Sequence, residues 1–314
     1  GLRCTPVQPR AGAESTHRMK VRSQLSAAEV SELLELLERR LAAVGMETQP
    51  EVARRILDLN ASKNAGLAEY AKVIRADAAL SGRVLRTVNS AFFAQRTPVT
   101  TLDRACVLLG LERLKSLALG FYLSHGAAHG GDKEFTRTVW GQSVFRACLS
   151  AELARTMDPG AASEAFVVGL MLDAGQPLLL RFEPAAYRAV LVAGATPHKT
   201  LQAEFETLPY THVDVAAALC RRWRLPAVLA KPIERHHAFP PEFEKGSRAP
   251  ERLLTLQRAA FYAGSVTLDP ITGRPVQSVP NPALGQRASG ATRDELAEVV
   301  RRACDEYRAV SGMF

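Results

Sequence analysis

The sequence predicts an all-α protein, and three features of its pattern carry the prediction. Apolar residues recur at intervals of three and four along most of the chain, which is the period of a buried helix face. Side chains that cap helices precede many of these stretches, and glycine follows several of them. No segment has the strict alternation of a half-buried strand, and Val276–Val279 is too short to count.

The first helices follow residues 1–25, which mix Pro, Arg, Ser and Thr without a period and predict a flexible tail. Ser26 and Glu29 form a capping box, in which each side chain bonds the backbone N–H of the other residue. A helix should therefore run over Ala27–Val44 and end at Gly45. As far as residue 124, further helices are expected over Pro50–Leu59, Leu67–Arg75, Ala78–Val88, Thr101–Leu109 and Glu112–Tyr122.

Capping signals are strongest in the first half of the chain. Asp77 should cap the helix that follows it, and Asn89-Ser90 should close that helix because asparagine tolerates the left-handed conformation. Thr100, with an acidic residue three positions later, should cap the next helix, which Gly110 stops. We interpret Asp77, Asn89, Ser90 and Gly110 as structural residues.

The second half is again helical by period, after a Gly- and His-rich connector at Ser124–Asp132. Helices are expected over Phe135–Met157, Ser163–Leu180, Pro184–Ala193, Thr200–Leu208, His212–Trp223, Pro226–His237 and Arg252–Gly264. Residues 265–290 are rich in Pro and Gly and predict an exposed loop, with an ordered extended hairpin as the alternative. Thr292 with Glu295 should cap a last amphipathic helix to about Val310, which we expect to dock on the protein's own core rather than on a partner.

The composition is ordinary for a folded soluble protein, with 47% hydrophobic and 23% charged residues and no apolar run near the ~20 residues that span a bilayer. Five cysteines, far apart and without a C-x-x-C pair, indicate reduced core thiols in a cytoplasmic protein. The net charge of +8 is interleaved with acidic side chains. We therefore expect solvated helix faces rather than a nucleic-acid or membrane surface.

Several motifs, in their identity and spacing, resemble the HDOD family, the HD-related output domains of bacterial signalling proteins. They are Asp77-Ala78-Ala79-Leu80, Leu85-Arg86, Asn89-Ser90-Ala91, Leu109-Gly110, Trp140-x-x-Ser143, the segment from Glu164-Ala165-Phe166 to Gly175, Glu204 ahead of His212-Val213, and Trp223 with His236-His237. The resemblance implies a two-lobed, HD-like helical bundle over 26–264, with lobes at about 26–124 and 133–264. Residues 265–314 would be a C-terminal extension outside it.

The related HD phosphohydrolases hold one or two divalent metals with a His, a His-Asp pair and a distal Asp, a set that suits activation of water against a phosphoester. By this resemblance the His-Asp pair reads Leu172-Asp173, and the upstream His position reads Gln142. His236 and His237 are expected in a last helical turn, where adjacent side chains point about 100° apart and should not both face one ion. We therefore expect no metal and no cofactor.

The resemblance implies a non-catalytic, cytoplasmic signalling or regulatory domain that binds a protein partner or a small signal, with homo-oligomerisation left open. The alternative is a degenerate metal-dependent HD phosphohydrolase of nucleotides or cyclic dinucleotides, which bound metal would reveal. A nucleic-acid-associated regulator is a weaker third interpretation, and it would show a steep salt dependence of binding. We expect the ligand groove between the two lobes. Its candidate residues are Trp140, Gln142, Asp173, His212, His236 and His237.

Overall fold

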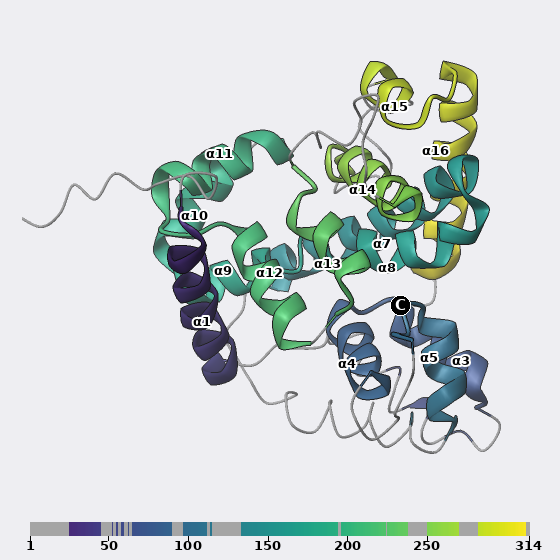
Figure 1. Ribbon diagram of the computed structural model, residues 1–314, viewed down its shortest axis with the longest axis horizontal. Coiled ribbons are helices and arrows are strands. Elements are labelled where there is room, and N and C mark those ends of the chain that lie inside the picture. Colours follow the sequence, from purple (N-terminus) through teal and green to yellow (C-terminus); the bar gives the residue numbers. More distant parts are fainter. Residues whose placement is uncertain are drawn as a thin grey trace, which may run out of the picture.

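A computed structural model describes residues 25–44, 65–89, 97–111, 133–193, 196–223, 225–237, 250–269 and 282–311, with isolated positions at 52, 55, 58–59, 62 and 114. These parts of the chain are helical and contain no β-strand, which confirms the all-α fold class (Figure 1). The helices are α1 (Ala27–Val44), α3 (Leu67–Arg75), α4 (Ala78–Val88), α5 (Leu102–Leu109), α7 (Lys133–Met157), α8 (Ala162–Met171), α9 (Gln176–Phe182), α10 (Pro184–Ala193), α11 (Pro197–Thr207), α12 (His212–Arg222), α13 (Ala227–Glu234), α14 (Glu251–Gly264), α15 (Pro282–Ser289) and α16 (Arg293–Ser311).

The helices form a small group and a large group. α3, α4 and α5 pack on one another in the lower part of Figure 1, and α4 joins them to α8 of the large group. In the large group α7 is central, because it packs against α8, α14 and α16. We expected α1 in the first lobe, but it packs on α12 of the large group, and an ion pair between Glu38 and Arg221 supports that contact.

Three of the expected helix caps are present as predicted. Ser26 and Glu29 exchange their two capping bonds, with N···O distances of 2.7 and 3.3 Å. The Asp77 carboxylate accepts the backbone N–H three residues later at 2.8 Å. Thr292 and Glu295 form the same box at the start of α16, with N···O distances of 2.7 and 3.3 Å. Local capping chemistry therefore places the starts of α1, α4 and α16.

The end of α4 differs from the expectation. Asn89 has φ −87° and ψ 4°, so its backbone is not left-handed. Its side-chain amide instead donates to the Val99 carbonyl at 2.8 Å and accepts the Val99 N–H at 2.7 Å. Asn89 is structural because its amide pairs with both backbone groups of a buried residue ten positions away. Ser90 lies outside the described residues.

Thr100 is not the cap of α5. Its hydroxyl donates to Glu164 on α8 at 2.5 Å, and Thr101 is the residue that precedes the helix. The acidic residue at the helix start, Asp103, pairs with Arg75 of α3 instead of closing a capping box. Gly110 does end α5, with φ 74°, a conformation that favours glycine. Tertiary partners have thus replaced a local cap at this helix.

The single helix expected over Ser163–Leu180 is two helices, α8 and α9, separated by a turn at residues 172–175. Pro177 has no backbone N–H and occupies the first turn of α9, where none is needed. Gly175 lies so close to α12 that a Cβ atom would approach the His212 carbonyl oxygen to 2.1 Å. The segment Glu164–Phe182 has the length and hydropathy of a membrane span, contrary to our expectation, but 83% of it is buried inside the protein.

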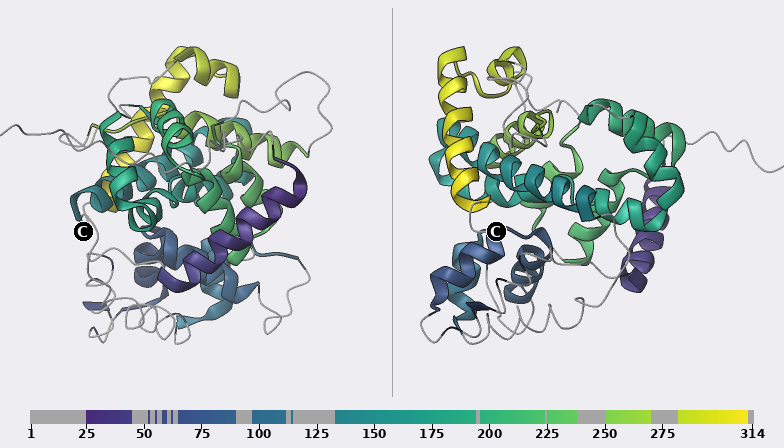
Figure 2. Two further views of the ribbon diagram at one scale, coloured as in Figure 1. Left: turned by 90° about the vertical axis from the view of Figure 1, so that its left-hand side faces the viewer. Right: turned by 180° about the vertical axis from the view of Figure 1, so that it is seen from behind.

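The C-terminal extension packs on the large group. Within the expected loop over 265–290, residues 282–289 form α15, and Val266 and Leu268 are buried. α16 lies along α7 as expected of a self-docking helix, with Leu296 and Val299 fully buried (Figure 2). Predictions for residues 1–24, 45, most of 50–59, 112–122, 124–132 and 270–281 concern parts outside the described residues.

Candidate functional site

A buried ion pair lies at the centre of the large group. Arg146 extends from α7, and Asp173 comes from the turn between α8 and α9. The guanidinium of Arg146 donates from Nη1 to Asp173 Oδ2, and the two side chains are 2% and 3% exposed. Burial lowers the pKa of Arg146 to about 9, so the guanidinium is protonated at neutral pH. The negative charge of Asp173 is therefore balanced by a cation of the protein itself.

The same face of α7 holds the segment that follows α14. Arg146 donates from Nε and Nη2 to the Val266 carbonyl at 3.3 and 3.1 Å. One turn earlier, Gln142 donates to the same carbonyl at 2.9 Å and accepts the Leu268 N–H at 3.0 Å. Both ends of the Gln142 amide are consequently used for structure.

A second polar group surrounds Glu204, which is fully buried on α11. The carboxylate accepts from His212 Nδ1 at 2.6 Å and from the His212 backbone N–H at 2.9 Å, both on Oε2. Tyr187 donates its hydroxyl to Oε1 at 3.2 Å. The other ring nitrogen of His212, Nε2, points away from Glu204 and lies 3.0 Å from His237 Nε2. That nitrogen lies 3.8 Å from Asp173 Oδ1, which links the two polar groups.

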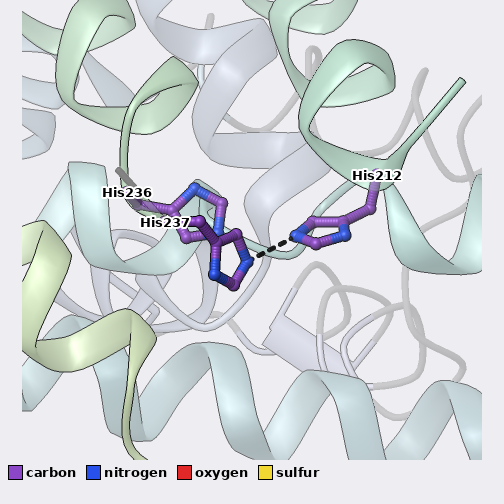
Figure 3. A group of neighbouring side chains, drawn as sticks. All are labelled: His212, His236 and His237. Atoms are coloured by element: carbon purple, nitrogen blue, oxygen red, sulfur yellow. Dashed lines mark hydrogen bonds between the residues drawn. The ribbon is translucent and has the colours of Figure 1, made fainter. Parts of the chain in front are cut away.

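His236 and His237 are not in a helical turn, and the geometric objection to their facing one ion is wrong. α13 ends at Glu234, and both histidines lie in the turn that follows it. Their ring centroids are 5.5 and 5.0 Å from that of His212, and His237 Nε2 is 3.0 Å from His212 Nε2 (Figure 3). The turn removes the 100° divergence that we assumed for consecutive helical residues.

Both of these histidines are neutral at neutral pH. Burial, then the neighbouring His212 ring, lowers the pKa of His236 well below its ordinary value, and the Arg146 cation acts in the same direction. For His237 the pKa is lowered first by burial and then by the rings of His236 and His212. Neutral imidazoles carry a free lone pair, which is the form that binds metals.

A cavity of about 240 Å³ lies between α7, α11 and the segment after α14. Its walls include Gln142, Arg146, Asp173, Gln176, Thr200 and Thr267. All of its described lining comes from residues 135–268, so this pocket is inside the second lobe and its extension, not between the lobes. A second cavity, of about 260 Å³, lies between the small and the large group of helices. Its walls include Arg75, Arg155 and Glu306.

Five of the six predicted site residues divide between two adjoining places. Gln142 and Asp173 line the 240 Å³ cavity, whereas His212, His236 and His237 form the adjoining histidine cluster. Trp140 is on α7, and its side chain lies outside the described residues. Sequence reasoning missed the role of Arg146, although a lone arginine within an otherwise apolar helical stretch, four residues after Gln142, was an available signal.

The residues at the HD metal positions do not fit a metal. Leu172 offers no ligand and is fully buried, and the Gln142 amide is bonded at both ends. Asp173 is held at Oδ2 by Arg146, whose positive charge repels a cation at this carboxylate. The described structure thus supplies no His-Asp pair for the phosphohydrolase chemistry that the wider superfamily implies.

The described residues form an all-helical protein with a buried polar cluster at its centre. The chain belongs to the HDOD domain family, whose model matches residues 46–239. A curated relative from Treponema pallidum, described as an uncharacterized protein, is 23% identical over 249 residues, covering 75% of this chain. The match spans only 45% of that relative's length.

Solved structures show the same fold at low sequence identity. The MmoQ response regulator from Methylococcus capsulatus is 24% identical with a TM-score of 0.61, covering 81% of this chain and 96% of that one. A virulence factor from Campylobacter jejuni is 16% identical with a TM-score of 0.59, covering 88% and 98%. The family expected from the sequence motifs is confirmed.

Proposed function

We propose that this chain is a non-catalytic HDOD signalling domain that regulates by binding a protein partner or a small signal. The observation that carries the proposal is the buried Arg146–Asp173 pair. Metal-dependent hydrolysis needs a Lewis acid and an activated water beside the phosphoester. At the HD aspartate this chain places a guanidinium, which has no open coordination position and cannot generate hydroxide.

Arg146 also makes it difficult for a metal ion to bind at Asp173. Removing one partner of a buried ion pair typically costs 3–5 kcal/mol, roughly, because the other charge is left without compensation. A metal could bind Asp173 Oδ2 only by displacing Arg146 from that oxygen, which would leave the guanidinium buried between α7 and Val266. The pair therefore favours a fixed structural role for Asp173.

The 240 Å³ cavity is the place we assign to a small signal. Threonine hydroxyls and the Gln176 amide on its walls suit a polar molecule, and Arg146 with Asp173 forms one side of it. A volume of this size lies below the ~300–1,000 Å³ of pockets for drug-sized ligands, so the ligand would be small. The described relative MmoQ is a response regulator, which agrees with a role in signal transduction.

The same proposal places the protein in a reducing compartment such as the cytoplasm. Cys106, Cys148 and Cys220 are buried free thiols, and Cys304 is a partly buried one. Free buried thiols are typical of intracellular proteins.

One observation favours the alternative of a degenerate phosphohydrolase. Three histidines converge beside the cavity, and imidazoles are common ligands of catalytic metals. A hydrolysis screen with phosphodiester and nucleotide substrates, with Mn²⁺ and then Mg²⁺ added, separates the two functions. We expect no turnover above a metal-only control. Robust metal-dependent hydrolysis that is lost in Asp173→Asn would overturn the proposal.

The binding role needs its own experiment. Thr200→Phe places a large ring at the cavity wall, and Gln202→Phe places the same ring on an exposed position of α11. Affinity capture from the native lysate, analysed for proteins and for small molecules by mass spectrometry, should give a specific species with the wild type and with Gln202→Phe. Thr200→Phe should lose it. Equal capture by all three proteins would exclude this cavity as the binding site.

A further inference from the structure

We propose that the second cavity, between the small and the large group of helices, binds a small zwitterion with an apolar body, of the class of the α-amino acids. The cavity has a volume of about 260 Å³ and is separate from the one that we assign to the signal. Its walls come from α3 and α5 of the small group and from α7, α8 and α16 of the large group (Figure 1). A ligand there would contact both groups, so this site goes beyond the proposed function.

One side of the cavity is apolar. It is formed by five side chains that are each buried in the protein, namely Leu102, Ala151, Ala162, Phe166 and Val167. Contact with this surface would remove hydrocarbon of the ligand from water, which is favourable. The ligand should therefore have an apolar side chain.

The other side of the cavity carries two cations and two anions. Arg75 and Asp103 come from the small group and form an ion pair. Arg155 of α7 and Glu306 of α16 come from the large group. Because the formal charges of these four side chains cancel, the lining as a whole does not favour a ligand with a net charge. A molecule that carries one positive and one negative group can use both kinds of side chain.

Glu306 is the acceptor to which we assign the ammonium group. Its Oε2 atom is buried and has no hydrogen-bond partner within the described residues. Arg155 Nη1 lies 4.0 Å from this oxygen, beyond hydrogen-bond distance, and donates to Glu152 on its own helix instead. Buried polar atoms are paired in the great majority of cases, so this oxygen needs a donor. An ammonium N–H of the ligand would supply it.

The two arginines supply the opposite charge. In the ion pairs with Asp103 and Glu152, Arg75 uses Nη2 and Arg155 uses Nη1. A guanidinium has five N–H donors, so each arginine keeps donors for a carboxylate, which it binds with charge-assisted hydrogen bonds. Since the arginines belong to different groups of helices, a carboxylate held by both would join α3 to α7.

Part of this site lies in the C-terminal extension. Glu306 is beyond residues 46–239, which the family model matches, and the C-terminal part of α16 points toward the small group (Figure 2). The site is therefore a property of this chain with its extension rather than of the matched domain alone. A bound ligand would fix the small group, α7 and α16 relative to one another.

Isothermal titration calorimetry of the full chain with L-leucine, L-valine, L-methionine and L-phenylalanine tests the site. At least one of the four should bind with one-to-one stoichiometry and raise the melting temperature of the protein. The amine and the carboxylic acid that correspond to this amino acid each lack one of its two charged groups, and each should bind at least tenfold more weakly. Equal binding of either analogue would overturn the assignment to a zwitterion.

Glu306→Gln keeps the size of the side chain and removes its charge, so it should weaken binding of the amino acid at least tenfold. The matched control is Asp305→Asn, at the neighbouring exposed position of α16, which should bind like the wild type. Thr200→Phe, which fills the other cavity, should also keep the affinity. Circular dichroism checks that the three variants are folded.

Absence of binding by all four amino acids, or equal binding by Glu306→Gln and the wild type, would overturn this site and leave the proposed function untouched. Binding that is lost in Thr200→Phe would place the amino acid in the other cavity and would also overturn the site. Metal-dependent hydrolysis together with intact amino-acid binding would overturn the proposed function alone.

Discussion

At the residue scale, two side-chain amides and one guanidinium join parts of the chain that are far apart in sequence. Asn89 bridges the end of α4 to Val99, and Gln142 with Arg146 holds Val266 against α7. These contacts pair buried backbone groups that would otherwise lack partners, which costs about 1–3 kcal/mol for each unsatisfied group. These three polar side chains thus fix the positions of Val99 and Val266 against the helices.

Replacing Asn89 by alanine should lower the free energy of unfolding by about 1–3 kcal/mol, because the N–H and carbonyl of buried Val99 lose their partner. Urea unfolding followed by circular dichroism measures the change. Arg86→Ala, at an exposed position of the same helix, is the matched control and should be nearly neutral. Equal stability of both variants would mean that water replaces the amide at Val99.

Acid should destabilise the protein through the histidine cluster. Burial holds the pKa of His236 and His237 well below 6.5 in the fold, and the unfolded chain binds their protons near pH 6.5. The stability contributed by these neutral rings is therefore complete above pH 6.5 and is lost as the pH falls below it. The slope reaches about 1.4 kcal/mol per pH unit for each histidine.

Urea unfolding between about pH 7.5 and 5.5 measures this slope. The charged and titratable groups that face the cluster are Arg146, Asp173, Glu204, His212 and His198. The slope is therefore compared between variants. His237→Gln should reduce it by about one proton, while Lys199→Gln, at an exposed position of α11, should keep it. A slope unchanged by His237→Gln would show that this ring titrates normally in the fold.

At the element scale, α16 shows how a charged amphipathic helix becomes part of the core. Leu296 and Val299 face inward, and Tyr307 meets Phe145 of α7 edge to face with ring centroids 5.9 Å apart. The opposite face carries ion pairs such as Arg301 with Glu298. Burial of the apolar stripe of α16, rather than its surface ion pairs, therefore holds this helix on the core.

Leu296→Ala should therefore destabilise the protein by roughly 2–5 kcal/mol, through loss of buried area and creation of a cavity beneath α15. Arg301→Ala, on the exposed face, should change little. Thermal and urea unfolding of the two variants measure the difference. If the leucine variant matched the arginine variant, α16 would be detached from α7 in solution.

Many element positions were predictable because their signals are local. α3, α4 and α10 have the expected bounds, and the caps at Asp77 and Thr292 are present. The errors arose where a distant partner decides the outcome. Thr100 bonds Glu164 on another helix, and α8 stops where Gly175 meets α12.

The candidate site was predictable in its residues but not in its geometry. The motifs pointed to Asp173, His212, His236 and His237, and these lie close together. The sequence could not reveal that α13 ends before His236, because the stretch keeps a helical pattern, nor that Arg146 neutralises Asp173 from α7. Such pairings depend on how α7 and the turn after α8 meet in space.

At the scale of the whole molecule, the segment after α14 affects which residues must be transferred together when this domain moves between proteins. The family match ends at residue 239, yet the Val266 carbonyl receives donors from both Gln142 and Arg146. If recombination transferred only the matched residues, Arg146 would lose its carbonyl acceptor at Val266. Gln142 would lose both of its partners, Val266 and Leu268. The portable unit therefore reaches beyond the family boundary, and any host protein that acquires this domain must acquire its C-terminal flank as well.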